Sequence, residues 1–372
     1  MSEQPSNELE RLCMSLLEIP SVIGDERRIA DFVENWVREK GFHAVTRAGD
    51  NLAIQPLPFR EGVPRLLLLG HLDTVPVSDA NPPRVAGDLI HGLGSSDMKG
   101  GDAVLLEILA RALEEEPRYD LVGVLYAAEE GPYEGSGMPE IISAAPGAFQ
   151  EVDLAVAMEP TDNQIELGCL GTMHAKVTFE GKRAHSARPW QGRNALHMAA
   201  PLMSAIAALE PRDIDHGGLR FREVLSVTML DYEGARNVIP GKCSFNLNFR
   251  FGPDRSSEEA IDWLEKFVRD AVGPGLWDAG LVRFEVTDLC PSGRVCGDNP
   301  LLAELRKAAG DEVQTLAKQA WTDVGRLSQM GLDALNFGPG SPSQAHQVGE
   351  HLSRARLAAS YAILARLLYP SD

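Results

Sequence analysis

Cysteine is scarce in this chain, and the few cysteines are scattered. Of 372 residues only five are cysteines, namely Cys13, Cys169, Cys243, Cys290 and Cys296. An odd number without a Cys-X-X-Cys pair indicates neither a zinc ribbon nor a disulfide framework. We therefore expect buried or incidental thiols.

Basic residues are outnumbered as well. The sequence has 35 Lys and Arg against 54 Asp and Glu, which gives a formal net charge of -19 and a pI near 4.9. No basic stripe or basic tail is visible that would meet a phosphate backbone. The composition therefore argues against a nucleic-acid partner.

Long apolar runs are also missing. No stretch approaches membrane-spanning length, and the opening MSEQPSNELERL lacks the charged and apolar regions of a signal peptide. We therefore expect a cytoplasmic protein without a membrane partner. A chain of 372 residues with 44% hydrophobic content can form two domains and a sizeable core.

What the sequence does have is a set of strand-like runs that end on polar residues. The run Leu66–Leu69 reads as a strand buried on both faces, and His71 and Asp73 follow it directly. In open α/β sheets, ligands bind beyond the carboxyl ends of strands. His-X-Asp alone is a weak signal, because a histidine after a strand is more often structural.

Three more strand-like runs end in the same way. They lead into Glu129 and Glu130, into Glu159, and into a Gly-Pro-Gly-Ser loop that ends at His346. Adjacent carboxylates are costly to bring together unless a cation neutralises them. The repetition therefore indicates a metal site.

A glycine-rich turn, GLGSSDMKGG, adds Asp97 and opens a predicted helix. The phosphate-binding Gly-X-X-X-X-Gly-Lys-Ser/Thr pattern is absent. Asp97 is either the N-cap of that helix or a carboxylate that bridges two cations beside His71.

The complete candidate ligand set is His71, Asp97, Glu130, Glu159 and His346. Nitrogen and oxygen ligands suit zinc, with manganese or cobalt as substitutes, and five ligands exceed what one catalytic zinc needs. We therefore expect two ions, each held by one His, one Glu and the shared Asp97. Glu129 would be the general base for the bridging water, and Asp73 would orient His71.

The middle of the chain predicts a second domain. Its elements are a strand at 173–181, a helix at 194–209, strands at 223–232 and 242–251, a helix at 257–272 and a strand at 281–288. This β-α-β-β-α-β order is the ferredoxin-like unit. We expect an α/β protein in which residues 172–289 are inserted into a helix-flanked, mixed-sheet domain made of residues 1–171 and 290–372.

The motifs GHLDTVP, SSDMKGG, AAEEG, MEP and FGPGSPSQAH together resemble the M20 metallopeptidase and amidohydrolase family over essentially the whole chain. Longer segments such as GKRAHSARPWQGRNALH and WTDVGRL resemble its subgroup that hydrolyses N-succinyl-LL-2,6-diaminopimelate. The resemblance implies a two-zinc catalytic domain and succinate and LL-2,6-diaminopimelate as products, in lysine and cell-wall precursor synthesis. It also implies that the inserted domain is a lid through which a homodimer forms.

The resemblance carries over the same metal ligands, with Glu129 as base and Asp73 as the partner of His71. It also marks His185, in the AHS motif, as the residue that polarises the scissile carbonyl from the other subunit. Three positions depart from the pattern, at Ala128, at residues 170–172 and at Gly241. These changes touch the hinge and lid, so we expect them to affect substrate fit before hydrolysis.

A substrate with carboxylates on both sides of its amide needs local positive charge. Arg188, Arg193, Arg236 and Arg250 cluster in the inserted domain, and guanidinium groups suit carboxylates. Arg250 with Asn237 resembles the substrate-contacting pair of the family. For Arg188 and Arg193, a solvated loop is an equally good interpretation.

Other functions share these catalytic residues. An acetylornithine deacetylase, an aminoacylase or a carboxypeptidase would use the same metals. Outside the enzymes, the chain could be a catalytically inactive metal-binding scaffold. Glu129 and His185 argue against a scaffold, since a structural zinc needs neither and favours four closed ligands, often cysteine.

Overall fold

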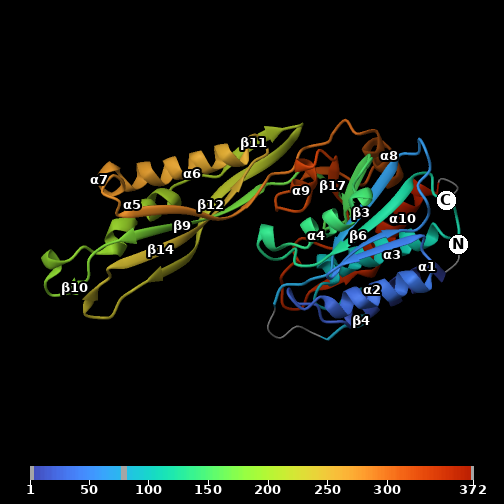
Figure 1. Cartoon of the computed structure of the whole chain (residues 1–372), viewed down its shortest axis with the longest axis horizontal. Helices are drawn as coiled ribbons and strands as arrows, with labels where there is room; N and C mark the ends of the chain where they lie inside the picture. The colour runs from blue at the N-terminus through green and yellow to red at the C-terminus, as the bar shows by residue number, and fades with distance from the viewer. Residues whose placement is uncertain (1–3, 77–81, 370–372) are drawn as a thin grey trace. The chain divides into compact units, whose positions relative to one another are not determined.

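The computed structural model describes residues 4–76 and 82–369, and these divide into two compact units (Figure 1). The second unit comprises Cys169–Gly293 and Ala317–Trp321, and the first comprises the other described residues. The predicted α/β class with a mixed sheet is confirmed. Among the residues described, no helix is long and apolar enough to cross a membrane.

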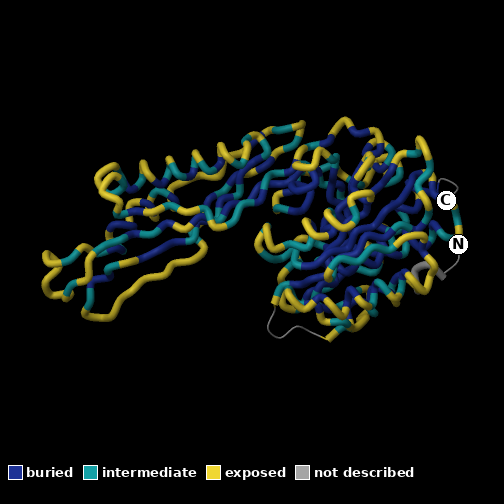
Figure 2. The backbone as a smooth tube through the Cα atoms, in the orientation of Figure 1, coloured by how far each residue is buried: buried dark blue, intermediate teal, exposed yellow. Residues whose placement is uncertain are grey.

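The first unit is built on an eight-stranded mixed sheet. Its strands, in spatial order, are β1 (Ala44–Ala48), β2 (Asn51–Gln55), β6 (Asp120–Tyr126), β3 (Arg65–His71), β7 (Leu154–Ala157), β17 (Ala334–Asn336), β8 (Ile165–Leu167) and β16 (Thr315–Ala317). The four central strands β6, β3, β7 and β17 run parallel. Every residue of β3 and β6 is buried, as expected for parallel strands covered on both faces (Figure 2).

Among the residues that the structure describes, seven α-helices surround this sheet: α1 (Gln4–Leu17), α2 (Arg27–Glu39), α3 (Gly100–Arg111), α4 (Met138–Ala144), α8 (Pro300–Ala309), α9 (Val324–Gln329) and α10 (Arg354–Leu368). Helix α3 contacts β3, β6, α1 and α10, so it lies at the centre of the packing. The first unit also contains a small antiparallel sheet of β4 (Arg84–Ala86), β5 (Leu89–His91) and β18 (His351–Ser353).

The register of the parallel strands brings the predicted site residues to one edge. His71 pairs with Tyr126, and Leu69 pairs with both Val124 and Ala157. The loops after β3, β6 and β7 therefore leave the sheet at the same level. These are the loops that carry His71, the Glu129–Glu130 pair and Glu159.

The second unit is a five-stranded antiparallel sheet with helices on one face. The strands lie in the order β11 (Arg212–His216), β12 (Leu219–Tyr232), β14 (Lys242–Phe251), β9 (Gly171–Glu180) and β15 (Val282–Cys290). The helices are α5 (Ala195–Ala207), α6 (Ser257–Val272) and α7 (Pro274–Trp277), and a two-stranded ribbon joins β10 (Ala184–His185) to β13 (Val238–Ile239). Alternate residues of β14, including Phe245 and Phe249, pack into the helix-covered core.

The five-stranded sheet contains one strand more than the predicted β-α-β-β-α-β order, and the ribbon of β10 and β13 adds two short strands outside it. Strand β11 pairs with the start of β12 through a tight turn at Gly217 and Gly218, both with positive φ (57° and 78°). Two residues with positive φ favour Gly-Gly in a two-residue hairpin. The predicted strand at 223–232 is therefore too short at its start, because the Gly-Gly turn places the beginning of β12 at Leu219.

Residues 317–321 were assigned from the sequence to the first domain but group with the second unit. The Gln319 side chain accepts a hydrogen bond from the backbone N–H of Arg222 (3.1 Å) and donates one to the carbonyl of Arg220 (3.0 Å). Strand β14 ends at Phe251 and pairs with β12 only from Val224 onward. Earlier residues of β12 therefore have no partner from β14, and the Gln319 amide pairs with two of their backbone groups. Only the tertiary fold shows this contact.

Candidate metal centre

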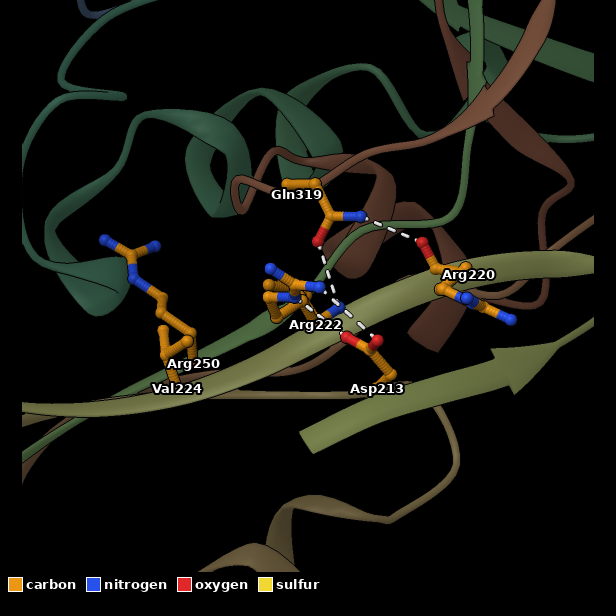
Figure 3. A pocket seen from close by; sticks show the side chains of 7 residues that line it. Asp213, Arg220, Arg222, Val224, Arg250 and Gln319 are labelled. Carbon is orange, nitrogen blue, oxygen red and sulfur yellow. Dashed lines mark hydrogen bonds and ion pairs between the residues drawn. The ribbon is translucent and has the colours of Figure 1, made fainter. Parts of the chain in front are cut away.

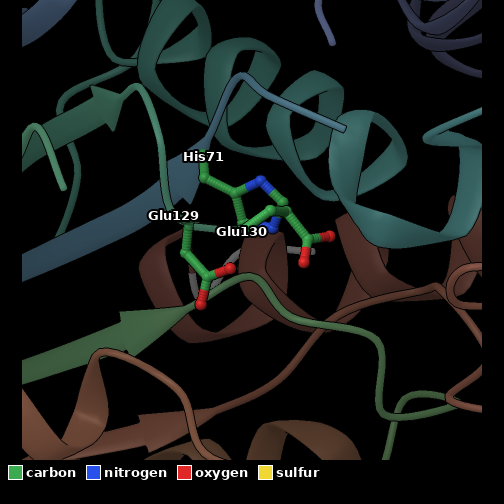
Figure 4. A group of neighbouring side chains, drawn as sticks. All are labelled: His71, Glu129 and Glu130. Carbon is green, nitrogen blue, oxygen red and sulfur yellow. The ribbon is translucent and has the colours of Figure 1, made fainter. Parts of the chain in front are cut away.

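Five predicted ligands meet at the carboxyl edge of the first unit's sheet. His71 ends β3 and is buried, with 1% of its surface exposed. Figure 4 shows its ring beside Glu129 and Glu130, which come from the loop after β6. His71, Glu129 and Glu130 each offer a ligand atom within 4.8 Å of the others.

Asp97 lies between the two histidines. One carboxylate oxygen, Oδ1, is 3.3 Å from His71 Nε2, and the other, Oδ2, is 3.6 Å from His346 Nε2. His346 Nε2 is also 3.0 Å from Glu130 Oε1. A carboxylate with one oxygen toward each imidazole has the geometry that a bridging ligand needs.

Two groups of three residues share Asp97. His71, Asp97 and Glu159 place ligand atoms within 4.8 Å of one another, and so do Asp97, Glu130 and His346. Each group has one imidazole, one carboxylate of its own and the shared carboxylate. This donor set fits two divalent cations of the zinc, cobalt or manganese type.

Asp97 does not take the N-cap position of α3 that was its alternative role. The N-cap position of α3 is taken by Lys99, whose side chain makes no capping hydrogen bond. Asp97 itself lies in an irregular turn, with φ -124° and ψ 92°. Its carboxylate is therefore directed by the turn and not by the helix.

The site gathers several carboxylates around His71, and their mutual repulsion favours the binding of positive charge. Burial raises the pKa of Glu129 well above its usual range, and the neighbouring Glu159 and Glu130 raise it further against the opposing effect of His71. Burial alone would lower the pKa of His71, but hydrogen bonds to Asp73 and Asp97 outweigh it and the pKa is raised well above normal. Carboxylates crowded in this way are what bound cations would neutralise.

Asp73 contacts more than the His71 ring. Its Oδ1 is 3.5 Å from His71 Nδ1, and its two carboxylate oxygens accept the backbone N–H groups of Glu129 and Glu130, each at 3.0 Å. The preceding Ala128 has a left-handed backbone with φ 57°. Asp73 therefore supports both the imidazole and the loop that carries the two glutamates.

A buried network that sequence reasoning did not identify lies behind this loop. Asp323, 1% exposed, accepts hydrogen bonds from the Tyr126 hydroxyl and from Arg326 Nε, the latter at 2.9 Å. Arg326 also donates to the carbonyl of Tyr133 (2.7 Å) and stacks on its ring. The WTDVGRL segment, which carries part of the family resemblance, supplies Asp323 and Arg326.

The remaining predicted residues lie in the second unit, in two separate places. His185 ends β10 of the ribbon and Asn237 directly precedes β13, where the Ser186 N–H donates to the Asn237 carbonyl (3.0 Å). Arg188 and Arg193 are exposed in the adjoining loop. Arg250 is eight residues along β14 from Lys242, the end nearest the ribbon, which is roughly 27 Å of strand.

Arg250 lines a cavity of about 530 Å³ within the second unit (Figure 3). The lining residues are Leu170, Asp213, Arg220, Arg222, Val224, Arg250 and Gln319. Arg222 is paired with Asp213 (2.8 Å). Arg250 donates only to the uncharged Asn248 Oδ1 (3.0 Å) and Thr172 Oγ1 (2.5 Å), and no salt bridge to it occurs among the described residues.

Comparison with known proteins identifies the family of the chain. A profile of Peptidase family M20/M25/M40 matches residues 67–369. The chain is 37% identical over 359 residues to a putative succinyl-diaminopimelate desuccinylase DapE of Mycobacterium tuberculosis, covering 96% of this chain and 97% of that protein. It is 36% identical over 370 residues to the succinyl-diaminopimelate desuccinylase of Corynebacterium glutamicum, covering 96% and 95%.

Solved structures show the same fold at low sequence identity. The aminopeptidase PepT of Bacillus cereus superposes with a TM-score of 0.78 at 17% identity, over 98% of each chain. The YXEP protein of Bacillus subtilis, described as a dinuclear metal binding peptidase from the M20 family, superposes with a TM-score of 0.71 at 14% identity, over 97% of each chain.

Proposed function

The chain belongs to peptidase family M20/M25/M40, and from this we propose that it is a two-metal amidohydrolase that cleaves N-succinyl-LL-2,6-diaminopimelate into succinate and LL-2,6-diaminopimelate. The observation that carries the proposal is identity of 36–37% over 96% of the chain to relatives with this name. Their names favour this substrate over acetylornithine. A role in lysine and cell-wall precursor synthesis agrees with the cytoplasmic location expected from the sequence.

We assign two Zn²⁺ ions to the two groups that share Asp97, with Co²⁺ or Mn²⁺ as substitutes. One ion would be held by His71, Asp97 and Glu159, and the other by Asp97, Glu130 and His346. When bound, the two cations would polarise the amide carbonyl and acidify a water molecule. The YXEP fold relative, with its dinuclear centre, supports the pair of ions.

Glu129 is the acid–base residue in this proposal. Its carboxylate lies within 4.8 Å of the ligand atoms of His71 and Glu130, yet neither Asp97-containing group needs it. The Asp73 carboxylate accepts a hydrogen bond from the Glu129 backbone N–H (3.0 Å). This contact fixes the backbone position from which the Glu129 side chain extends. The carboxylate takes a proton from the attacking water and returns it to the leaving amine nitrogen.

His185 serves as the donor to the developing oxyanion. Its Nδ1 accepts a hydrogen bond from the Ala187 N–H (3.0 Å), so the ring proton of the neutral imidazole is on Nε2. His185 is exposed, which leaves this N–H free to reach a substrate. A hydrogen-bond donor aimed at the carbonyl oxygen stabilises the tetrahedral state.

We infer a homodimer through the second unit. Asn237 lies in the ribbon before Lys242, and eight residues of β14, roughly 27 Å of strand, separate Lys242 from Arg250, so we infer that Asn237 and Arg250 contact one small substrate from different copies. Among the described residues, β11 covers this edge of β12 only at residues 219–223. The rest of the edge has no partner strand there, and Met229, Leu230 and Tyr232 of β12 are exposed. An exposed apolar edge strand is a template for pairing with a second copy.

Arg250 is the residue that we expect to bind a substrate carboxylate. It faces a cavity, its described partners are uncharged, and burial lowers its pKa. A guanidinium without a counter-ion in such a place favours an anionic ligand. Arg188 and Arg193, exposed near His185, are weaker candidates for a second carboxylate.

The test is hydrolysis of N-succinyl-LL-2,6-diaminopimelate beside N-acetylornithine, with protein stripped by a chelator and reloaded with zinc to known stoichiometry. Zinc-dependent preference for the succinylated compound supports the proposal. Activity on acetylornithine alone would keep the mechanism and replace the substrate. Binding of zinc without cleavage of any amide would contradict catalysis and indicate a metal-binding scaffold.

A further inference from the structure

Glu350 is a buried carboxylate that the proposed mechanism does not use. Only 3% of its surface is exposed. Its Oε2 accepts the backbone N–H of Gly94 (2.8 Å), and its Oε1 accepts those of Ser96 (2.8 Å) and Asp97 (3.0 Å). Three amide groups of one turn therefore converge on a single side chain from more than 250 residues away.

The turn needs this external acceptor. Asp97 and Met98 have non-helical backbone angles, and Gly94 has a left-handed φ of 83°. Amide groups in such a turn lack the regular acceptors of a helix and must be paired by another group. A carboxylate accepts several N–H groups at once, and its charge strengthens each hydrogen bond.

Glu350 also lies in the segment that carries His346. It follows His346 by four residues, and its N–H donates to the carbonyl of Gln347 (3.3 Å) while its own carbonyl accepts the N–H of Gly92 (3.2 Å). The side chain and backbone of Glu350 thus join the Asp97 turn to the His346 segment. Asp97 and His346 belong to the same group of candidate ligands, together with Glu130.

We propose that Glu350 is a positioning residue that holds the Asp97 carboxylate between the two histidines and thereby sets the affinity for the cation at Asp97, Glu130 and His346. The inference rests on the two-metal function proposed above. Both carboxylate oxygens of Glu350 are occupied by backbone N–H groups, so it acts through Asp97 and not as a ligand. Outer partners of this kind typically change metal affinity by 10- to 100-fold.

The experiment titrates the metal-free protein with Co²⁺, followed by calorimetry and by visible absorption, in the wild type, E350Q, E350D and the control E312Q. A glutamine at 350 keeps one acceptor oxygen but turns an NH₂ group toward backbone N–H donors. We therefore expect the ion at Asp97, Glu130 and His346, here called the second ion, to bind about 10- to 100-fold more weakly. The affinity for the first ion, at His71, Asp97 and Glu159, should fall less, because His71 and Glu159 do not depend on Glu350 for their positions. E350D, which keeps the charge, should fall between E350Q and the wild type, and E312Q, at an exposed site, should match the wild type.

Amide hydrogen exchange in the metal-free protein gives an independent readout. The amides of Gly94, Ser96 and Asp97 should exchange faster in E350Q than in the wild type, while those of strand β6 should not change. If E350Q does not fold, the same comparison is made with E350D, in which the shorter side chain cannot reach all three amides. Unchanged exchange together with unchanged affinity for the second ion would overturn the proposal.

The outcomes separate this inference from the proposed function. A wild-type protein that binds two ions but does not hydrolyse the substrate would contradict the function and leave the role of Glu350 testable by the titration. A wild type that binds no second ion would contradict both the two-metal function and the effect on metal affinity. Normal hydrolysis with an E350Q variant that binds both ions like the wild type would contradict only the role of Glu350.

Discussion

The carbonyl oxygen of Ser96 occupies the place that a β-carbon on Gly340 would take. Only glycine lets the loop before His346 pass so close to the turn that carries Asp97. The loop is tied there by the Asp162 N–H, which donates to the Gly340 carbonyl (2.7 Å). Two of the proposed ligands are thus brought together by the absence of a side chain.

A Gly340→Ala substitution should therefore push the two loops apart. The obstacle is backbone and cannot rotate away, so we expect a loss of about 1–3 kcal/mol of stability and weaker metal binding. Urea unfolding of the metal-free protein and a Co²⁺ titration measure the two effects. Gly297→Ala is the matched control, since a β-carbon there meets nothing within 4 Å. Equal stability of the two variants would show that the close approach is not required.

Tyr126→Phe tests the buried network behind the Glu129 loop. The substitution removes the hydroxyl that donates to Asp323 and leaves a buried carboxylate oxygen with one partner fewer. We expect a loss of about 1–3 kcal/mol of stability, measured by urea unfolding. Because the network supports the loop that carries the base, kcat should fall more than KM rises. Tyr119→Phe, at another buried tyrosine, is the control and should leave kcat unchanged.

Stability at alkaline pH should depend on Cys13. Burial, and next the nearby Asp102, raise the pKa of its thiol from 9.0 to about 12. The unfolded chain therefore loses this proton first, and stability that is fully present below pH 9 decreases by about 1.4 kcal/mol per pH unit between pH 9 and 12. Unfolding under reducing conditions at several pH values, in the wild type and Cys13→Ala, isolates this contribution. Parallel pH profiles for the two proteins would contradict it.

Arg250→Gln should weaken substrate binding. Loss of a hydrogen bond to a charged group costs about 1.5–3 kcal/mol, which corresponds to a rise in KM of roughly 10- to 150-fold for the succinylated substrate. Arg283→Gln, an exposed arginine on the same sheet, should have no such effect. Steady-state kinetics of both variants make the comparison. An unchanged KM in Arg250→Gln would remove this residue from the substrate site.

Subunit complementation tests the shared active site. Glu129→Gln and His185→Asn should each be nearly inactive, because each damages both sites of a symmetric dimer. When the two variants are co-expressed, a mixed dimer contains one site with both residues intact. We expect roughly a quarter of wild-type activity from a random mixture. Absence of any recovered activity, or sedimentation of active protein as a monomer, would contradict a His185 contributed by the second copy.

Elements with local signals could be predicted from the sequence. Apolar runs that end on His71, Glu129 and Glu159 could be recognised because strand length and polarity are properties of neighbouring residues. In the second unit, the predicted ranges of β14 and α6 agree with the structure at Lys242–Phe251 and Ser257–Val272. The family could be identified for the same reason, since its motifs are contiguous.

Contacts between distant groups are visible only in the folded chain. Asp73 reaches the backbone of Glu129, Glu350 reaches the turn of Asp97, and Gln319 reaches β12 from another part of the chain. No pattern in the sequence predicts such contacts, because they depend on how the loops run in space. Their partners are backbone amides, which every residue except proline carries, so the residue type gives no signal. The sequence therefore names the candidate ligands, and only the fold shows what holds them in place.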